Sequence, residues 1–135
     1  MFNNYTVGKV KKPKGQKEAH DKLVKSLLDF IVLQFLSTEP MHGYQIISRV
    51  RQNFGIYLRA STIYPLLGAL EENGCVTSEW NINSERPKKV YRLTREGRQQ
   101  LLCAENSLNS ICRKLAIQAF IETSVTLEPA DGTRR

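Results

Sequence analysis

The chain has few of the residues on which disulfide frameworks, metal sites and membrane spans depend. It contains three cysteines and two histidines among its 135 residues. Cys75, Cys103 and Cys112 are an odd number without C-x-x-C spacing, so neither a disulfide framework nor a zinc site is indicated. No apolar run reaches the ~18–20 residues of a membrane helix, and the polar start lacks the apolar core of a secretory signal. We therefore expect a reducing, cytoplasmic location.

Arrangements of catalytic residues are missing as well. The sequence offers no Cys–His or Ser–His arrangement, no glycine-rich phosphate loop and no isolated pair of carboxylates. We therefore expect neither enzymatic activity nor a cofactor or metal. Positive charge is plentiful instead, with 20 Lys and Arg against 13 Asp and Glu and a formal net charge of +7. That balance favours a polyanionic partner, either nucleic acid or an anionic membrane surface, although many soluble proteins are simply basic.

The first segment, residues 1–19, is basic and poor in apolar side chains. Its five lysines surround Pro13 and Gly15, and they are Lys9, Lys11, Lys12, Lys14 and Lys17. Such a composition predicts a mobile arm. The arm is either a solvated tail or a source of extra phosphate and minor-groove contacts.

Residues 20–94 predict a mainly α domain with a small two-stranded β wing, a winged helix-turn-helix. The first helix, about 20–36, is apolar on more than one side, which indicates a second buried face and hence a dimer. A second helix, about 41–53, places Tyr44, Ile47, Val50 and Phe54 at helical spacing. His42 near its start is expected to cap it or to pack there.

The third helix, about 60–73, divides into an apolar side and a polar side. Its apolar side is formed by Ile63, Leu66, Leu67 and Leu70, at helical spacing. The opposite side presents small hydroxyls, a phenol, a proline and a glycine, namely Ser61, Thr62, Tyr64, Pro65 and Gly68. This flat, hydrogen-bonding surface can approach a DNA groove closely, and Pro65 is tolerated because it lies near the helix start.

Two strands follow, at about 76–80 and 90–93, joined by a basic loop. Tyr91 and Leu93 are expected to face inward. The loop carries Arg86, Lys88 and Lys89, which we expect to contact phosphates, although many charged turns are only solvated.

The last helix, about 95–122, begins after Thr94, a suitable cap. It carries apolar residues at heptad spacing, which are Leu101, Ala104, Leu108, Ile111 and Leu115. Such a seam predicts a partner subunit. Residues 123–135 are expected to form a flexible tail. Cys103 and Cys112 on this helix are interpreted as buried small side chains rather than as a redox switch.

Several short motifs together resemble the PadR-like transcriptional regulators. They lie at residues 40–44, 61–67, 70–74, 78–80 and 86–94, with Gly97, and the resemblance covers roughly residues 26–100. It implies a homodimeric repressor on an inverted-repeat operator, of the short branch with one C-terminal helix. In that family this helix dimerises with the first helix of the partner, and some relatives bind flat hydrophobic or phenolic ligands near the dimer interface. Arg59 stands where relatives often carry a serine cap, so the recognition helix could begin at Ser61.

The resulting hypothesis is a sequence-specific regulator that binds double-stranded DNA as a homodimer. Its expected DNA-binding residues are His42, Tyr44, Arg59, Ser61, Thr62, Tyr64, Pro65, Arg86, Lys88 and Lys89. Its expected dimerisation residues are Leu27, Ile31, Leu101, Ala104, Leu108, Ile111 and Leu115. Two alternatives remain at this point. One is a winged helix used only for protein–protein contact, and the other is a sensor of a small aromatic or hydrophobic effector, with a site between the subunits near Trp80 and Phe120.

Overall fold

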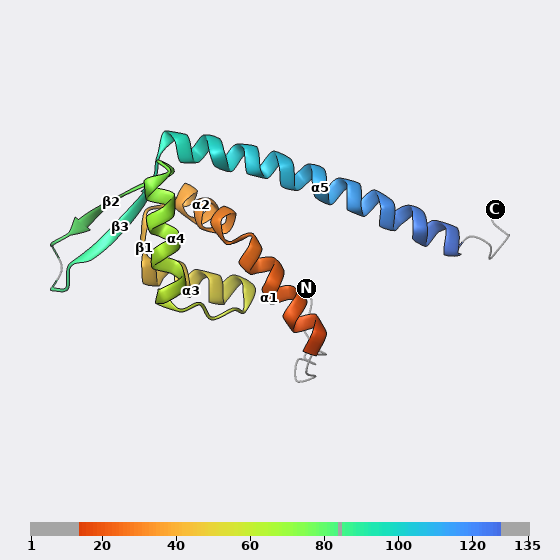
Figure 1. The fold of residues 1–135 in the computed structure, drawn as a ribbon, viewed down its shortest axis with the longest axis horizontal. Helices are drawn as coiled ribbons and strands as arrows, with labels where there is room; N and C mark the ends of the chain where they lie inside the picture. Colours follow the sequence, from red (N-terminus) through yellow and green to blue (C-terminus); the bar gives the residue numbers. More distant parts are fainter. Residues whose placement is uncertain (1–13, 84, 128–135) are drawn as a thin grey trace. The chain divides into compact units, whose positions relative to one another are not determined.

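The computed structural model describes residues 14–83 and 85–127 (Figure 1). The chain forms two compact units, one up to Arg98 and one from Gln99 onward, and each is described by itself. The first unit contains α1 to α4 and a small sheet, and the second consists of most of α5. The fold is the predicted one, mainly α with a β wing. Across the described residues, no helix is long and apolar enough to cross a membrane.

The predicted first helix is in fact two helices, α1 (Lys14–Ser26) and α2 (Leu28–Thr38). Leu27 leaves helical geometry, with φ −102° and ψ 12°. Helical hydrogen bonds still continue across it, because its N–H donates to the Leu23 carbonyl at 3.1 Å and its carbonyl accepts from the Ile31 N–H at 2.9 Å. The arm boundary at residue 19 was wrong, since residues 14–19 are helical. The rest of the predicted arm lies outside the described residues.

A two-residue strand, β1 (Met41–His42), stands where the second helix was expected to begin. It pairs antiparallel with β3 (Lys88–Leu93), Met41 opposite Tyr91, and β3 pairs antiparallel with β2 (Val76–Asn81). The sheet therefore has three strands in the order β1-β3-β2 rather than the predicted two. In this sheet Tyr91 is buried, as its alternation predicted.

The two helices of the helix-turn-helix are α3 (Gly43–Phe54) and α4 (Ala60–Glu72). Helix α3 ends at Gly55, whose φ of 71° lies in the left-handed region that glycine adopts without strain. Its buried side is formed by Ile46, Ile47 and Val50, so the prediction that Tyr44 belongs to that side was wrong. Tyr44 lies in the first turn and faces solvent. Of the predicted apolar side of α4, Ile63, Leu67 and Leu70 are buried, whereas Leu66 is only partly buried.

The core of the first unit is assembled from all of these elements. Its largest fully buried side chains come from α2, β1, α3, α4 and β2, and they are Val32, Met41, Ile46, Val50, Ile63, Leu67 and Val76. No buried polar or charged side chain occurs among the described residues. The core thus fixes α4 and the wing on one apolar scaffold.

Helix α5 (Arg95–Leu127) begins as predicted after Thr94. The Thr94 hydroxyl donates to the Gly74 carbonyl at 2.6 Å, and it accepts from the Gly97 N–H at 2.9 Å. This is the geometry of an N-cap. The helix continues to Leu127, so the flexible tail predicted from residue 123 was wrong for residues 123–127. Residues 128–135 lie outside the described part of the chain.

Candidate nucleic-acid interface

Helix α4 presents the surface that its periodicity predicted. Ile63, Leu67 and Leu70 are buried against the domain, and the predicted polar edge is exposed at Ser61, Thr62, Tyr64, Pro65 and Gly68. Hydroxyls and a phenol offer both donors and acceptors to base edges. A glycine on the same face lets another molecule approach the backbone.

Arg59 is the N-cap of α4, so the helix begins at Ala60 rather than at Ser61. Its carbonyl accepts hydrogen bonds from the N–H groups of Thr62 at 2.9 Å and Ile63 at 3.2 Å, and its side chain makes no capping bond. A cation at this end opposes the helix dipole. An anion such as a phosphate would be attracted both by the guanidinium and by the helix terminus.

Tyr64 does not project freely from α4, because its ring packs against the start of α3. Gly43 is buried there, and a Cβ built on it would meet the Cζ and Oη atoms of Tyr64 and lie 2.7 Å from its Cε1. Tyr44 approaches the same ring edge-on, with the centroids 6.3 Å apart and the planes at 72°. The contact leaves Tyr64 only 36% exposed. Gly43 is therefore a determinant of the recognition surface that the periodicity of the sequence could not reveal.

The protonation states of two groups on this surface follow from their surroundings. Burial, followed by the neighbouring Tyr44, raises the pKa of Tyr64, so its phenol stays neutral and can donate a hydrogen bond. Burial, followed by the charge of Lys88, lowers the pKa of His42. His42 is the N-cap of α3, as predicted, and its backbone N–H donates to Gln45 Oε1 at 2.9 Å. The imidazole is thus neutral at physiological pH.

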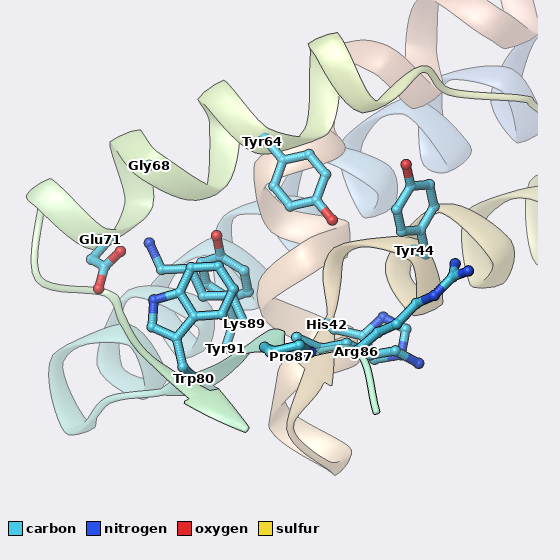
Figure 2. Close-up of a pocket in the computed structure, with 11 residues that line it drawn as sticks. His42, Tyr44, Tyr64, Gly68, Glu71, Trp80, Arg86, Pro87, Lys89 and Tyr91 are labelled. Atoms are coloured by element: carbon cyan, nitrogen blue, oxygen red, sulfur yellow. The ribbon is translucent and has the colours of Figure 1, made fainter. Parts of the chain in front are cut away.

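A groove of about 660 Å³ separates the exposed side of α4 from the wing (Figure 2). It brings together predicted residues from three separate segments. Its lining consists of His42, Tyr44, Tyr64, Gly68, Glu71, Trp80, Arg86, Pro87, Lys88, Lys89 and Tyr91. Five of these were not among the expected DNA-binding residues, namely Gly68 and Glu71 of α4, Trp80 of β2, Pro87 just before β3 and Tyr91 of β3.

Charge in this groove is predominantly positive. Arg86, Lys88 and Lys89 line it, and Lys89 Nζ lies 6.0 Å from the centroid of the Trp80 ring. Glu71 is the one carboxylate among its described lining residues, and its Oε2 accepts a hydrogen bond from Ser78 Oγ at 2.7 Å. The site therefore combines aromatic surface, cations and one fixed acceptor. In residues 14–83 and 85–127, no cluster of three or more His, Cys, Asp or Glu could hold a metal.

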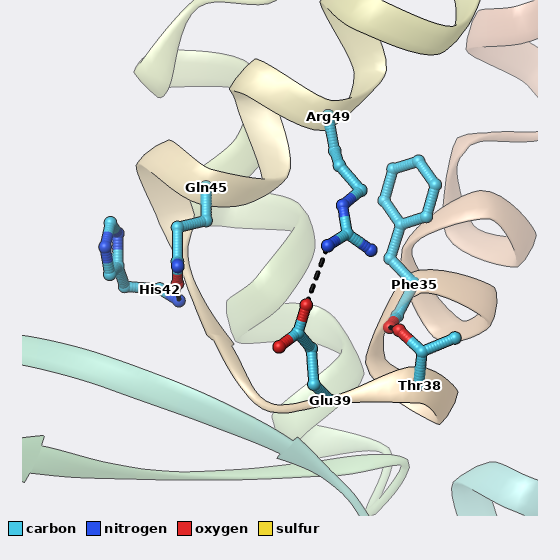
Figure 3. A network of polar contacts seen from close by, with 6 residues as sticks. All are labelled: Phe35, Thr38, Glu39, His42, Gln45 and Arg49. Carbon is cyan, nitrogen blue, oxygen red and sulfur yellow. Dashed lines mark hydrogen bonds and ion pairs between the residues drawn. The ribbon is translucent and has the colours of Figure 1, made fainter.

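A polar contact joins α3 to Glu39, the residue that follows α2 (Figure 3). Arg49 Nη2 lies 2.7 Å from Glu39 Oε2, and its guanidinium carbon lies 5.7 Å from the centroid of the Phe35 ring. The pair is partly exposed, so its contribution to stability is modest, ~0.2–1 kcal/mol. The contact connects the middle of α3 to the C-terminal end of α2.

The predicted dimerisation residues differ in accessibility. Ile31 is buried within the first unit, whereas Leu27 is partly exposed beside the more exposed Leu23 on α1. In the second unit, Ile111 is 54% and Leu115 is 66% exposed. Of the remaining predicted residues of α5, Leu101 is buried within the single chain, whereas Ala104 and Leu108 are partly exposed. The interpretation of Cys103 and Cys112 as buried was wrong, because both are exposed on α5, and only Cys75 is buried.

Comparison with known proteins points to one family. A sequence model of the transcriptional regulator PadR-like family matches residues 32–102. Transcriptional regulator Rv3488 of Mycobacterium tuberculosis is 27% identical over 84 residues, which cover 62% of this chain and 78% of that protein.

Solved structures give the same result. A PadR family transcriptional regulator from Eggerthella lenta is 31% identical and superposes with a TM-score of 0.69, covering 76% of this chain and 90% of that one. A PadR family transcription regulator from Clostridium difficile is 26% identical with a TM-score of 0.61, covering 70% of this chain and 98% of that one. The similarity therefore spans the winged helix and extends into α5.

Proposed function

The chain belongs to the PadR-like family of transcriptional regulators, and we propose that it acts as a homodimeric repressor on an inverted-repeat operator in double-stranded DNA. The observation that carries this proposal is the placement of the polar side of α4 and the wing cations around one groove. A helix with exposed donors and acceptors can read base edges, while neighbouring cations hold the phosphates.

Base reading is assigned to α4. Ser61, Thr62 and Tyr64 are exposed on its outer side, and the neutral phenol of Tyr64 can both donate and accept. Pro65 and Gly68 add a short, flat surface that allows close approach. Changes at these positions should alter which sequences are preferred.

Phosphate contact is assigned to the cations around α4. Arg86, Lys88 and Lys89 belong to the wing, and Arg59 stands at the N-terminus of α4. Contacts with phosphates set affinity and register without reading sequence. His42 and Tyr44, at the start of α3, line the same groove and would lie beside the bound backbone.

Dimerisation is assigned to exposed apolar residues at the end of α1 and on α5. Leu23 lies on α1 and Leu27 is the residue that follows this helix, whereas Ile111 and Leu115 are one helical turn apart on α5. A single chain leaves these apolar side chains exposed at helical spacing. We infer that a second copy of the chain buries them. Two symmetric recognition helices would then enter half-sites about one turn of DNA apart, ~34 Å or a multiple.

The division of roles is tested by selecting bound fragments from genomic DNA and titrating them with variants by fluorescence anisotropy. Replacing Lys88 and Lys89 by Ala should weaken binding to all fragments alike and lower the salt slope by about 2. Thr62→Ala should instead change the preferred sequence. The control is the double replacement of Lys22 and Lys25 by Ala, which removes the same charge from α1. If the wing variant changed only sequence preference, the assignment of roles would be reversed.

A further inference from the structure

The groove between α4 and the wing has a different chemical character at each end. In Figure 2, Glu71 and Trp80 lie at one end, while Tyr44 and Arg86 lie at the other. Tyr64 stands between them with its hydroxyl directed into the groove. A duplex phosphate chain needs the cations alone, so the carboxylate and the exposed indole call for a separate explanation.

The Glu71 end is an acceptor site. Ser78 Oγ donates to Glu71 Oε2 at 2.7 Å, which orients the carboxylate. A carboxylate has about four acceptor positions, so one hydrogen bond leaves capacity for further donors. Burial raises the pKa of the Tyr91 phenol, and the neighbouring Glu71 and Tyr64 raise it further. The Glu71 charge therefore lies close to the Tyr91 phenol, and both residues line the groove.

The middle of the groove is aromatic. Trp80 is 61% exposed although it is the largest side chain of the wing, and Lys89 Nζ stands 6.0 Å from its ring centroid. Tyr64 and Tyr91 also line this part. Exposed indole and phenol rings in a cationic groove suit a flat, electron-rich ring that stacks on them.

The far end is cationic. Lys88 lies close enough to His42 to depress the pKa of its imidazole, and Arg86 lines the same end. An anionic group placed there would meet two positive side chains and a neutral imidazole that can donate a hydrogen bond. One end of the groove therefore holds the Glu71 acceptor, the aromatic part carries Lys89 beside Trp80, and the far end holds Arg86 and Lys88.

We propose that this groove binds a free guanine nucleotide, with the base stacked near Trp80, its Watson–Crick N–H groups donating to Glu71, and its phosphate held by Arg86 and Lys88. Guanine offers two adjacent N–H donors, which match the two oxygens of one carboxylate. A simple aromatic acid would leave Glu71 without a donor and is disfavoured. The cavity volume of about 660 Å³ lies within the usual ~300–1,000 Å³ of small-molecule sites.

Occupation of the groove would compete with DNA. Tyr64 and Lys88 belong both to the nucleotide site and to the surface assigned to DNA, so the two ligands exclude each other. This competition rests on the DNA-binding function proposed above. The nucleotide would then act as an effector that releases the operator.

Direct binding is tested without DNA, by calorimetry and by the fluorescence of Trp80, the single tryptophan of the chain. Guanosine 5′-monophosphate should bind and quench the indole. Guanosine, which lacks the phosphate, ribose 5-phosphate, which lacks the base, and thymidine 5′-monophosphate, which lacks paired donors, should each bind at least about tenfold more weakly. Equal binding of ribose 5-phosphate would show a simple anion site, and binding only to single-stranded oligonucleotides would show a strand-binding surface. Either result overturns the proposal.

A pair of matched variants tests the carboxylate. Glu71→Gln keeps the size of the side chain and should weaken binding of guanosine 5′-monophosphate about tenfold or more, with little effect on ribose 5-phosphate. Glu79→Gln makes the same change on the exposed part of β2, outside the set of groove-lining residues, and should leave binding unchanged. Thermal unfolding of both variants shows that they are folded. Equal losses in the two variants, or none in Glu71→Gln, would overturn the assignment.

The final arm adds guanosine 5′-monophosphate to a complex with a selected DNA fragment. Release of DNA at nucleotide concentrations that saturate the calorimetric site is the expected result, and nucleotide binding without release would overturn the overlap. Because calorimetry uses no DNA, the two proposals fail separately. A chain that binds DNA but not guanosine 5′-monophosphate would refute the nucleotide site. A chain that binds guanosine 5′-monophosphate but not DNA would refute the DNA-binding function.

Discussion

Replacing Gly43 by Ala should disturb DNA binding without touching DNA. A Cβ at this position would lie 2.7 Å from Tyr64 Cε1 and closer still to its Cζ and Oη. Carbon atoms prefer a separation of about 3.5–4.0 Å, so the ring must retreat by roughly 1 Å or more. The clashing atoms are the far end of a side chain that can rotate, so Tyr64 should swing into the groove while α3 stays in place.

The effects on stability and on affinity should therefore separate. Alanine is favoured over glycine in a helix by about 0.5–1 kcal/mol, which offsets part of the lost packing. We expect the free energy of unfolding of Gly43→Ala to stay within about 1 kcal/mol of the original chain. A displaced base-contacting side chain costs about 1–3 kcal/mol of binding, or roughly 5- to 150-fold in affinity.

A double-mutant cycle identifies the cause. Affinity for a selected DNA fragment is measured by anisotropy for Gly43→Ala, Tyr64→Ala and the combination, with thermal unfolding of each variant. In the Tyr64→Ala background the new methyl group meets no ring, so Gly43→Ala should cost little further affinity. Two results would refute this explanation: an equal loss of affinity from Gly43→Ala in both backgrounds, or no loss of affinity from Gly43→Ala alone. Either would show that the packing of Tyr64 on Gly43 does not control DNA binding.

Three further predictions concern stability, pH and assembly. Thr94→Ala should lower the free energy of unfolding by about 0.5–2 kcal/mol in chemical denaturation because the cap of α5 is lost, whereas Thr94→Ser should retain most of it. Burial holds the pKa of His42 below its ordinary 6.5, so the folded state disfavours protonation. Stability should therefore be complete above pH 6.5 and decline as the pH falls through the lowered pKa, and denaturation of His42→Gln should show a smaller decline. Replacing Ile111 and Leu115 by Glu should yield monomers in sedimentation, while Lys114→Glu should not, and persistence of a dimer in the first variant would exclude this surface.

The periodicity of the sequence was sufficient to predict the architecture of the site. Ile63, Leu67 and Leu70 fix the buried side of α4, which determines the opposite, exposed side. The strands of the wing followed from alternation, confirmed by the burial of Tyr91. These features depend on neighbours within a few residues, which a sequence displays directly.

Features that depend on distant contacts could not be predicted in this way. A strand of two residues, Met41–His42, has no alternation to detect and forms only because β3 lies beside it. The break at Leu27 carries neither glycine nor proline. In the sequence, Gly43 is an ordinary glycine at the start of a helix. Its role depends on Tyr64, a residue distant in the sequence that packs on it. Glu71 likewise lines the groove only because the wing lies beside α4, a contact between distant parts of the sequence.

Whether this groove binds DNA is decided by the salt dependence of binding to a duplex fragment selected from genomic DNA. Each phosphate neutralised by the wing and the α4 terminus should contribute about −0.9 to the slope of log affinity against log salt. We predict a steep linear decline that becomes shallower by about 2 when Lys88 and Lys89 are replaced by Ala. An affinity that stayed flat from low to moderate salt, or a slope unchanged in that variant, would contradict the assignment of this groove to DNA.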